Sequence, residues 1–188
     1  DPFRDPECPA IAAVGSTVTV TGDCTANDYR MWFGSATIMH SGTDDRDLTI
    51  DGFGNAEDPG LLATLSGTAS IRALADGRHE FDLDLVNDAP FEGVLTIAYL
   101  GTVEGGYADA TTWNGSGTLV LEGDTVAAST VDEVWDPDAC GGAPASGETT
   151  LTSEAHGVTI RYDGAIDCAE AQNAAWSLDG VDQDPIDG

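Results

Sequence analysis

The feature that most constrains the fold is an alternation of apolar and polar side chains with a period of two residues. It runs through residues 17–21, 79–85 and 158–162. Successive side chains of a β-strand point to opposite faces, so this period predicts half-buried strands rather than helices. Further stretches rich in β-branched residues lie near residues 35–40, 47–51, 61–73, 93–100, 117–121, 125–134 and 148–152.

Turn signals between these stretches predict how the strands are connected. They are the dipeptides Asp51-Gly52, Asp76-Gly77, Asn114-Gly115, Asp163-Gly164 and Asp179-Gly180. About ten to twelve short strands at regular spacing predict an all-β, antiparallel sandwich or barrel-like domain, with a stacked-sheet solenoid as a third arrangement. Residues 169–175 alone have helical composition, so we expect at most one short helix.

The length and hydrophobic content favour a single domain. The chain has 188 residues, of which 41% are hydrophobic, enough for one core. We therefore predict one β-domain over residues 1–188, with polar tails at about residues 1–7 and 179–188. The residues expected to face its core are Val18, Val20, Phe81, Leu83, Leu85, Val158 and Ile160.

Charge narrows the classes of partner. The chain has 34 acidic residues and six basic ones, all arginine, for a net charge of −28. This excludes a phosphate-binding nucleic-acid surface and predicts repulsion from anionic membranes. The apolar stretches are also too short for a transmembrane segment. We interpret the charge as adaptation to salty water, where screening acts within about 10 Å. The alternative is binding of cations or cationic partners.

The cysteines indicate the compartment. Cys8, Cys24, Cys140 and Cys168 form an even number without any CxxC spacing, which favours two disulfides over a zinc site. Proximity in sequence favours the pairs Cys8–Cys24 and Cys140–Cys168, although four cysteines allow three connectivities. Disulfides indicate an oxidising, extracytoplasmic location, and we interpret the start at Asp1 as the mature form of an exported protein.

Calcium is the cofactor that the sequence favours most. Hard cations bind six to eight oxygen ligands from carboxylates and carbonyls on loops. One dense group of such ligands is Asp44, Asp45, Asp47 and Asp51, and a second is Asp179, Asp182 and Asp184. Neither group matches the twelve-residue EF-hand loop. Solvated acidic loops are the alternative interpretation of both.

Catalytic motifs do not emerge from the sequence. There is no Gly-x-Ser-x-Gly nucleophile motif, and His40, His79 and His156 lie far apart along the chain. Pairs of carboxylates, which a glycoside hydrolase would use, are too common in this chain to single out any two. We therefore predict no catalytic residue.

Two short segments and the general composition of the strands carry a resemblance to known proteins. Cys8-Pro9-Ala10-Ile11, Thr21-Gly22-Asp23-Cys24-Thr25 and the strands rich in Asp, Gly and Thr resemble secreted or lipid-anchored β-domains of marine and predatory bacteria. The resemblance covers about the first 50 residues and the region from Cys140 to Trp176. It implies an exported location and identifies no active-site residue.

Together these observations favour a non-catalytic, extracellular structural or adhesive protein. We expect a subunit of a surface assembly or filament, whose partners are copies of itself or other surface proteins. An edge strand, or the tail at residues 1–7, would add to a neighbouring sheet. The alternative is a calcium- or carbohydrate-binding module, and a more remote alternative is a secreted hydrolase that uses paired carboxylates.

Overall fold

The computed structural model of the protein describes residues 8–26, 30–90, 93–105, 110–136, 144–163 and 174–184. The strands of the first half are β1 (Ala10–Val14), β2 (Thr17–Thr21), β3 (Cys24–Thr25), β4 (Met31–His40), β5 (Arg46–Ala56), β6 (Thr64–Ala73) and β7 (His79–Ala89). The strands of the second half are β8 (Gly93–Glu104), β9 (Thr111–Leu121), β10 (Asp124–Trp135), β11 (Ser146–Thr152), β12 (Gly157–Asp163), β13 (Ala174–Leu178) and β14 (Val181–Asp182). One short 3-10 helix, η1 (Pro59–Leu61), lies between β5 and β6.

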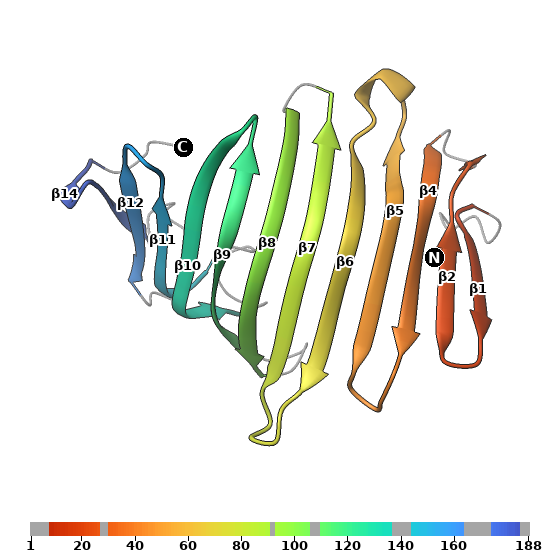
Figure 1. Ribbon diagram of the computed structural model, residues 1–188, viewed down its shortest axis with the longest axis horizontal. Helices are drawn as coiled ribbons and strands as arrows, with labels where there is room; N and C mark the ends of the chain where they lie inside the picture. The colour runs from red at the N-terminus through yellow and green to blue at the C-terminus, as the bar shows by residue number, and fades with distance from the viewer. Residues whose placement is uncertain are drawn as a thin grey trace. The chain divides into compact units, whose positions relative to one another are not determined.

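The strands of the described residues form one antiparallel meander (Figure 1). Their order is β1-β2-β4-β5-β6-β7-β8-β9-β10-β11-β12-β13-β14, and β3 pairs with β4 beside this path. The all-β prediction is therefore confirmed. The closed barrel is wrong, because the path ends at β1 and β14 and these two strands do not pair. The described residues form 14 strands rather than ten to twelve, and these strands belong to one hydrogen-bonded sheet.

The chain divides into two compact units, which we describe separately. The first unit comprises Asp1–Arg72, Asp82–Ala98 and Val120–Gly123, and the second comprises Ala73–Phe81, Tyr99–Leu119 and Asp124–Gly188. The first contains the pairs from β1 to β6, and the second contains those from β10 to β14. That the whole chain is one domain stays a prediction.

In the first unit, the strand register separates two kinds of side chain. Residues opposite one another on adjacent strands share a face, as do residues two apart on one strand. The face that we call the apolar face carries Ile11, Ala13, Val18, Val20, Ala36, Ile38, Leu48, Ile50, Ala69 and Ile71. Ile50 is buried, and the members on β2, β4 and β6 are half-buried. The predicted core positions Val18 and Val20 thus share one apolar surface.

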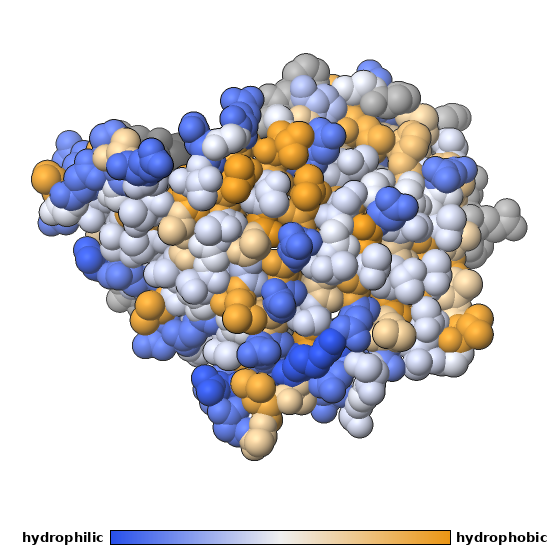
Figure 2. All heavy atoms as spheres, viewed as in Figure 1, coloured by the Kyte–Doolittle hydropathy of each residue, from blue (hydrophilic) through white to orange (hydrophobic). Residues whose placement is uncertain are grey.

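The opposite face of the first unit, which we call the hydroxyl face, is rich in threonine and serine. It carries Thr17, Thr19, Thr21, Ser35, Thr37, Thr49, Thr68 and Ser70. Figure 2 shows pale side chains of intermediate hydropathy over β4 and β5. One row of this face runs straight across the strands, from Thr19 through Thr37 and Thr49 to Thr68. The alternation in residues 17–21 therefore separates a polar from an apolar face, as predicted.

The second unit repeats this separation on β11, β12 and β13. Ile160 lies opposite Thr149 and Trp176, and Val158 lies opposite Leu178. On the other face a row of hydroxyl side chains runs through Ser129, Thr150, Thr159 and Ser177. The prediction that Val158 and Ile160 share a face is confirmed.

Few apolar side chains are buried in the described residues. They are Cys8, Ile50, Ala56, Phe81, Ala89, Ala128 and Ala145, and most of them are small. Among the predicted core positions Phe81 is buried, whereas Leu83, Leu85, Val158 and Ile160 are half-buried. The main-chain hydrogen bonds between strands are consequently a large part of what holds the fold.

Several local predictions need correction. Asp51-Gly52 lies inside β5, at a register shift with Gly52 at φ 55°, so it forms a bulge and not a turn. Asn114-Gly115 lies inside β9. Asp76-Gly77 and Asp179-Gly180 do lie between strands, as predicted. Asp163-Gly164 is only partly described, because Gly164 lies outside the described residues.

The predictions of a helix and of a polar C-terminal tail also need correction. Ala174 and Ala175 belong to β13, because they pair with β12, and residues 169–173 lie outside the described residues. The tail predicted at residues 179–188 contains β14, which pairs with β13 through Ser177–Asp182 and Leu178–Val181. The predicted tail at residues 1–7 lies outside the described residues.

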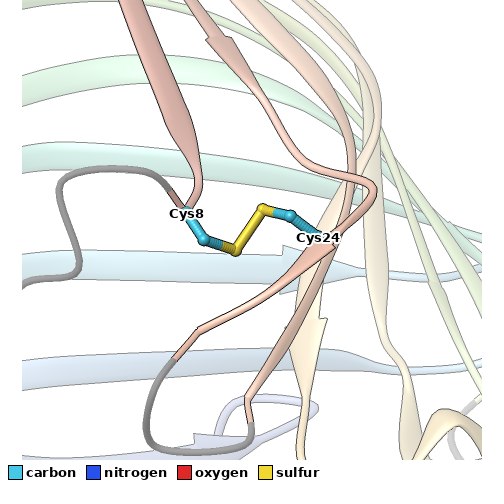
Figure 3. Close-up of a disulfide and its surroundings, with 2 residues drawn as sticks. All are labelled: Cys8 and Cys24. Carbon is cyan, nitrogen blue, oxygen red and sulfur yellow. A yellow bond between two sulfur atoms is a disulfide. The ribbon is translucent and has the colours of Figure 1, made fainter.

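A disulfide fastens the first edge of the sheet. Cys8, just before β1, is bonded to Cys24 on β3, across a sequence separation of 16 residues (Figure 3). Cys24 lies opposite Trp32 on β4, whose ring is 5.6 Å from that of Phe53 between centroids. The disulfide therefore ties the start of β1 to a strand that pairs with β4. The second predicted pair, Cys140–Cys168, lies outside the described residues.

Replacing both Cys8 and Cys24 by serine should lower the free energy of unfolding. The chain-entropy model gives about 3 kcal/mol for a loop of this length. Urea unfolding followed by tryptophan fluorescence would measure the change. An unfolding free energy equal to that of the unmodified protein would contradict the prediction.

Candidate functional site

Strand β1 is an exposed edge of the first unit. Its sequence is Ala-Ile-Ala-Ala-Val and all five residues are exposed, with Ile11 at 50% and Val14 at 79%. In the described residues it pairs with β2 on one side alone. The N–H and C=O groups on its other side can therefore bond to an added strand.

The hairpin that contains β1 is free of charged side chains. Residues 8–22 hold no Asp, Glu, Lys or Arg, and no longer stretch of this kind occurs in the sequence. Two copies with a net charge of −28 repel one another, and this repulsion is weakest where neither copy presents a local charge. The β1 edge thus lies in the longest stretch of the sequence without charged side chains.

The last strand of the path, β14, offers far fewer main-chain groups for pairing than β1 does. Strand β14 consists of Val181 and Asp182, and the Val181 side chain is 63% exposed. Two residues form too few main-chain hydrogen bonds to hold a partner strand. Of the two edges, β1 is therefore the stronger candidate.

The second unit contains a buried carboxylate, Glu133, which is 8% exposed. Its Oε1 accepts a hydrogen bond of 2.7 Å from the indole Nε1 of Trp135, and its Oε2 accepts one from the hydroxyl of Thr149. Thr149 is in turn hydrogen-bonded to Tyr162. Buried carboxylates are costly unless such donors surround them. Glu133 thus orients side chains on β10, β11 and β12.

Hydrogen bonds extend this network to β9. The indole Nε1 of Trp113 donates to the Thr111 hydroxyl at 2.8 Å, and that hydroxyl lies 3.5 Å from the carbonyl oxygen of Trp135. Trp135 keeps 37% of its surface exposed while its indole N–H is held by Glu133. A part-exposed indole of fixed orientation can stack on a flat or apolar group of a ligand.

Aromatic rings pack beside this network. The Phe81 and Tyr99 rings are stacked with centroids 5.7 Å apart, and Trp113 meets Phe81 edge-on at 4.8 Å. A Cβ added to Gly115 would lie 2.5 Å from the Tyr99 ring, and one added to Gly101 would lie 2.6 Å from the Phe81 ring. The rings therefore cover glycine backbone, at positions where a side chain would clash with them.

A β-bulge in β10 positions Glu133. The register with β11 shifts between Val131 and Val134, and Asp132 has φ 49°. The Asp132 N–H donates to the Asn114 side chain at 2.9 Å. A Cβ on Gly147 of β11 would lie 2.4 Å from the Asp132 carbonyl oxygen, so the neighbouring strand needs glycine here.

Two tyrosines next to this network have perturbed acidity. Burial raises the pKa of Tyr99, and the charge of Glu133 adds to the effect, whereas a hydrogen bond with Thr130 opposes it. Burial also raises the pKa of Tyr162, with a further contribution from Glu133 and an opposing hydrogen bond with Thr149. Both phenols therefore keep their protons to higher pH than an exposed tyrosine does.

The first predicted calcium group is spread over a hairpin. Asp44 and Asp45 lie between β4 and β5, while Asp47 and Asp51 lie on β5, on the hydroxyl face. Asp47 forms an ion pair with Arg72 and raises the pKa of that guanidinium. The Asp47 carboxylate therefore links β5 to β6 through its ion pair with Arg72.

The second predicted calcium group surrounds the β13–β14 turn. Asp179 accepts hydrogen bonds from the Gly157 N–H at 2.8 Å and pairs with His156 at 2.9 Å, and these contacts lower its pKa. Asp182 lies on β14, and the main-chain oxygen of Asp184 accepts a hydrogen bond from Trp176. Within the described ranges no three His, Cys, Asp or Glu side chains are close enough to hold a metal ion. Calcium binding stays a prediction.

Sequence reasoning missed Glu133 and Trp135, and it predicted an associating edge strand without identifying that strand as β1. The pair Asp132-Glu133 inside an otherwise β-branched stretch was the available signal for a bulge. The absence of charge from residues 8–22 was the signal for the edge.

No protein-family model, curated protein or solved structure matches this chain. The resemblance to secreted bacterial β-domains stays a prediction. Among the described residues, no helix has the length and apolar character needed to cross a membrane.

Replacing Glu133 by glutamine should destabilise the protein by about 1–3 kcal/mol, because the amide cannot accept from both Trp135 and Thr149 with the same geometry. Urea unfolding would measure the loss. The matched control is Glu148→Gln on β11, which removes an exposed ion pair with Arg161 and should cost less than about 1 kcal/mol. Equal losses in the two variants would contradict the network.

Stability should also fall in alkaline solution. The raised pKa values of Tyr99 and Tyr162 mean that the unfolded chain releases these protons first, at a pH of about 10. Their stabilising contribution is complete below that pH and is lost as the pH rises through the folded values. Tyr99→Phe and Tyr162→Phe should each flatten the decline in unfolding free energy with pH. An unchanged slope in both variants would refute the assignment.

Proposed function

We propose that the protein is a non-catalytic, extracellular structural or adhesive protein that joins copies of itself through strand β1. The observation that carries the proposal is an exposed, uncharged edge strand in a chain of net charge −28. Strand β1 itself contains no lysine, proline or bulge, the features with which natural sheets usually block their edges.

The pairing that fits best is β1 against β1 of a second copy, in antiparallel orientation. Such a contact uses the same surface on both copies, as two-fold symmetry requires. It would extend the sheet by main-chain hydrogen bonds, with Ile11 and Val14 adding apolar contact. The Cys8–Cys24 disulfide supports this role, since it holds the start of β1 in place before a partner arrives.

Charge sets the conditions for this assembly. At low ionic strength the acidic surfaces of two copies repel over about 30 Å, whereas in 1 M salt the range falls to about 3 Å. Association through an uncharged strand should therefore strengthen with salt. This agrees with our interpretation of the composition as an adaptation to salty water.

The test compares two lysine substitutions in the same row of the sheet. Ala12 on β1 lies opposite Thr19, and the row continues through Thr37 and Thr49 to Thr68 on β6. Ala12→Lys places a charge at the edge, and Thr68→Lys places the same charge on the same face inside the sheet. Analytical ultracentrifugation in high salt would measure the association of each.

We expect Ala12→Lys to weaken association by at least about tenfold, or ~1.4 kcal/mol, and Thr68→Lys to leave it unchanged. A monomer at every salt concentration for the unmodified protein would overturn the proposal. Equal association of the unmodified protein and Ala12→Lys would also overturn it.

A further inference from the structure

We propose that the apolar face of the first unit binds a single-chain amphiphile with an anionic head group. The hydrocarbon chain would lie across the face, and Arg46 at the end of the face would bind the head group. This inference does not require association through β1, since it concerns a face of the sheet rather than its edge, although Ile11 belongs to both surfaces.

The strand register places a cationic residue at the end of the apolar face. Arg46, Leu48 and Ile50 alternate on β5 and therefore point to the same side. Arg46 lies opposite His40 on β4 and Ile71 on β6. The face thus passes from aliphatic side chains to an arginine and a histidine, over about 13 Å between Ile50 and Arg46 along the strand.

The guanidinium of Arg46 lacks a hydrogen-bond acceptor for one of its nitrogens. Nη1 of Arg46 is buried from solvent and has no hydrogen-bond partner. Every other buried side-chain nitrogen or oxygen of the described residues has one. Leaving a charged donor in this state costs more than leaving a neutral one. A carboxylate or phosphate oxygen would satisfy it, since arginine matches the geometry of both.

Three other arginines, unlike Arg46, have their guanidinium groups paired with carboxylates. Arg72 pairs with Asp47, Arg78 pairs with Asp76, and Arg161 pairs with Glu148. Acidic side chains are abundant in this chain, yet none accepts from Nη1 of Arg46. Because Arg46 is only half-buried as a whole residue, rotation of its long side chain can bring the guanidinium to an incoming head group.

The aliphatic part of the face suits a hydrocarbon chain. Ile38, Leu48 and Ile71 are half-buried, and Ile11 at the β1 end is 50% exposed. Covering this surface removes apolar area from water, which favours binding in proportion to chain length. A basic group at one end fixes the direction in which an acidic amphiphile lies.

The experiment uses the full chain and two ligands that share a twelve-carbon chain, dodecanoate and dodecanol. Binding is measured by calorimetry in high salt, below the concentration at which dodecanoate forms micelles. We expect dodecanoate to bind at least tenfold more tightly than dodecanol. Lengthening the carboxylate chain should strengthen binding by up to about fourfold for each methylene.

Arg46→Gln should remove the advantage of dodecanoate while leaving dodecanol binding unchanged, and Arg46→Lys should keep part of it. Arg161→Gln, which changes an exposed arginine of the second unit, is the matched control and should alter neither ligand. Equal affinity of the unmodified protein for the two ligands would overturn the proposal, and this comparison needs no variant. Binding of neither ligand, or an equal loss in Arg46→Gln and Arg161→Gln, would also overturn it.

Discussion

The structure depends above all on main-chain hydrogen bonding between strands that follow one another in the sequence. With few buried apolar side chains in the described residues, each strand is held largely by its two neighbours. A meander satisfies the main-chain groups of its inner strands, and among the described residues the first strand, β1, has a partner strand on one side only. The exposure of β1 follows from the open path of the sheet, and the proposed association follows from that exposure.

Departures from a regular ladder shape the second unit. A bulge at Asp132 turns Glu133 toward the face where Thr149 and Trp135 can donate to it. Glycine at position 147 lets the neighbouring strand approach the bulge, and glycine at position 115 makes room for the Tyr99 ring. The positions of the buried Glu133 carboxylate and of the Tyr99 ring therefore both depend on glycines, at positions 147 and 115, that leave space for them.

Charge divides the surface into regions with different roles. Acidic residues are spread over most of the chain, while residues 8–22 carry no charged side chain. The apolar face of the first unit ends in a guanidinium that lacks a full set of acceptors. Each of these two regions supports one of the two proposals.

The sequence by itself determined the all-β class and the faces of the strands, because a period of two residues is a local property that survives any arrangement of the strands. It also indicated the Cys8–Cys24 disulfide, since closeness in sequence makes a short loop. The openness of the sheet, the bulge beneath Glu133 and the alignment of Arg46 with the apolar face could not be read in this way. Each depends on which strand lies beside which and in what register, and alternation alone is the same in a barrel, a sandwich and an open sheet. Only the tertiary structure decided them, because register is fixed by contacts between residues far apart in the chain.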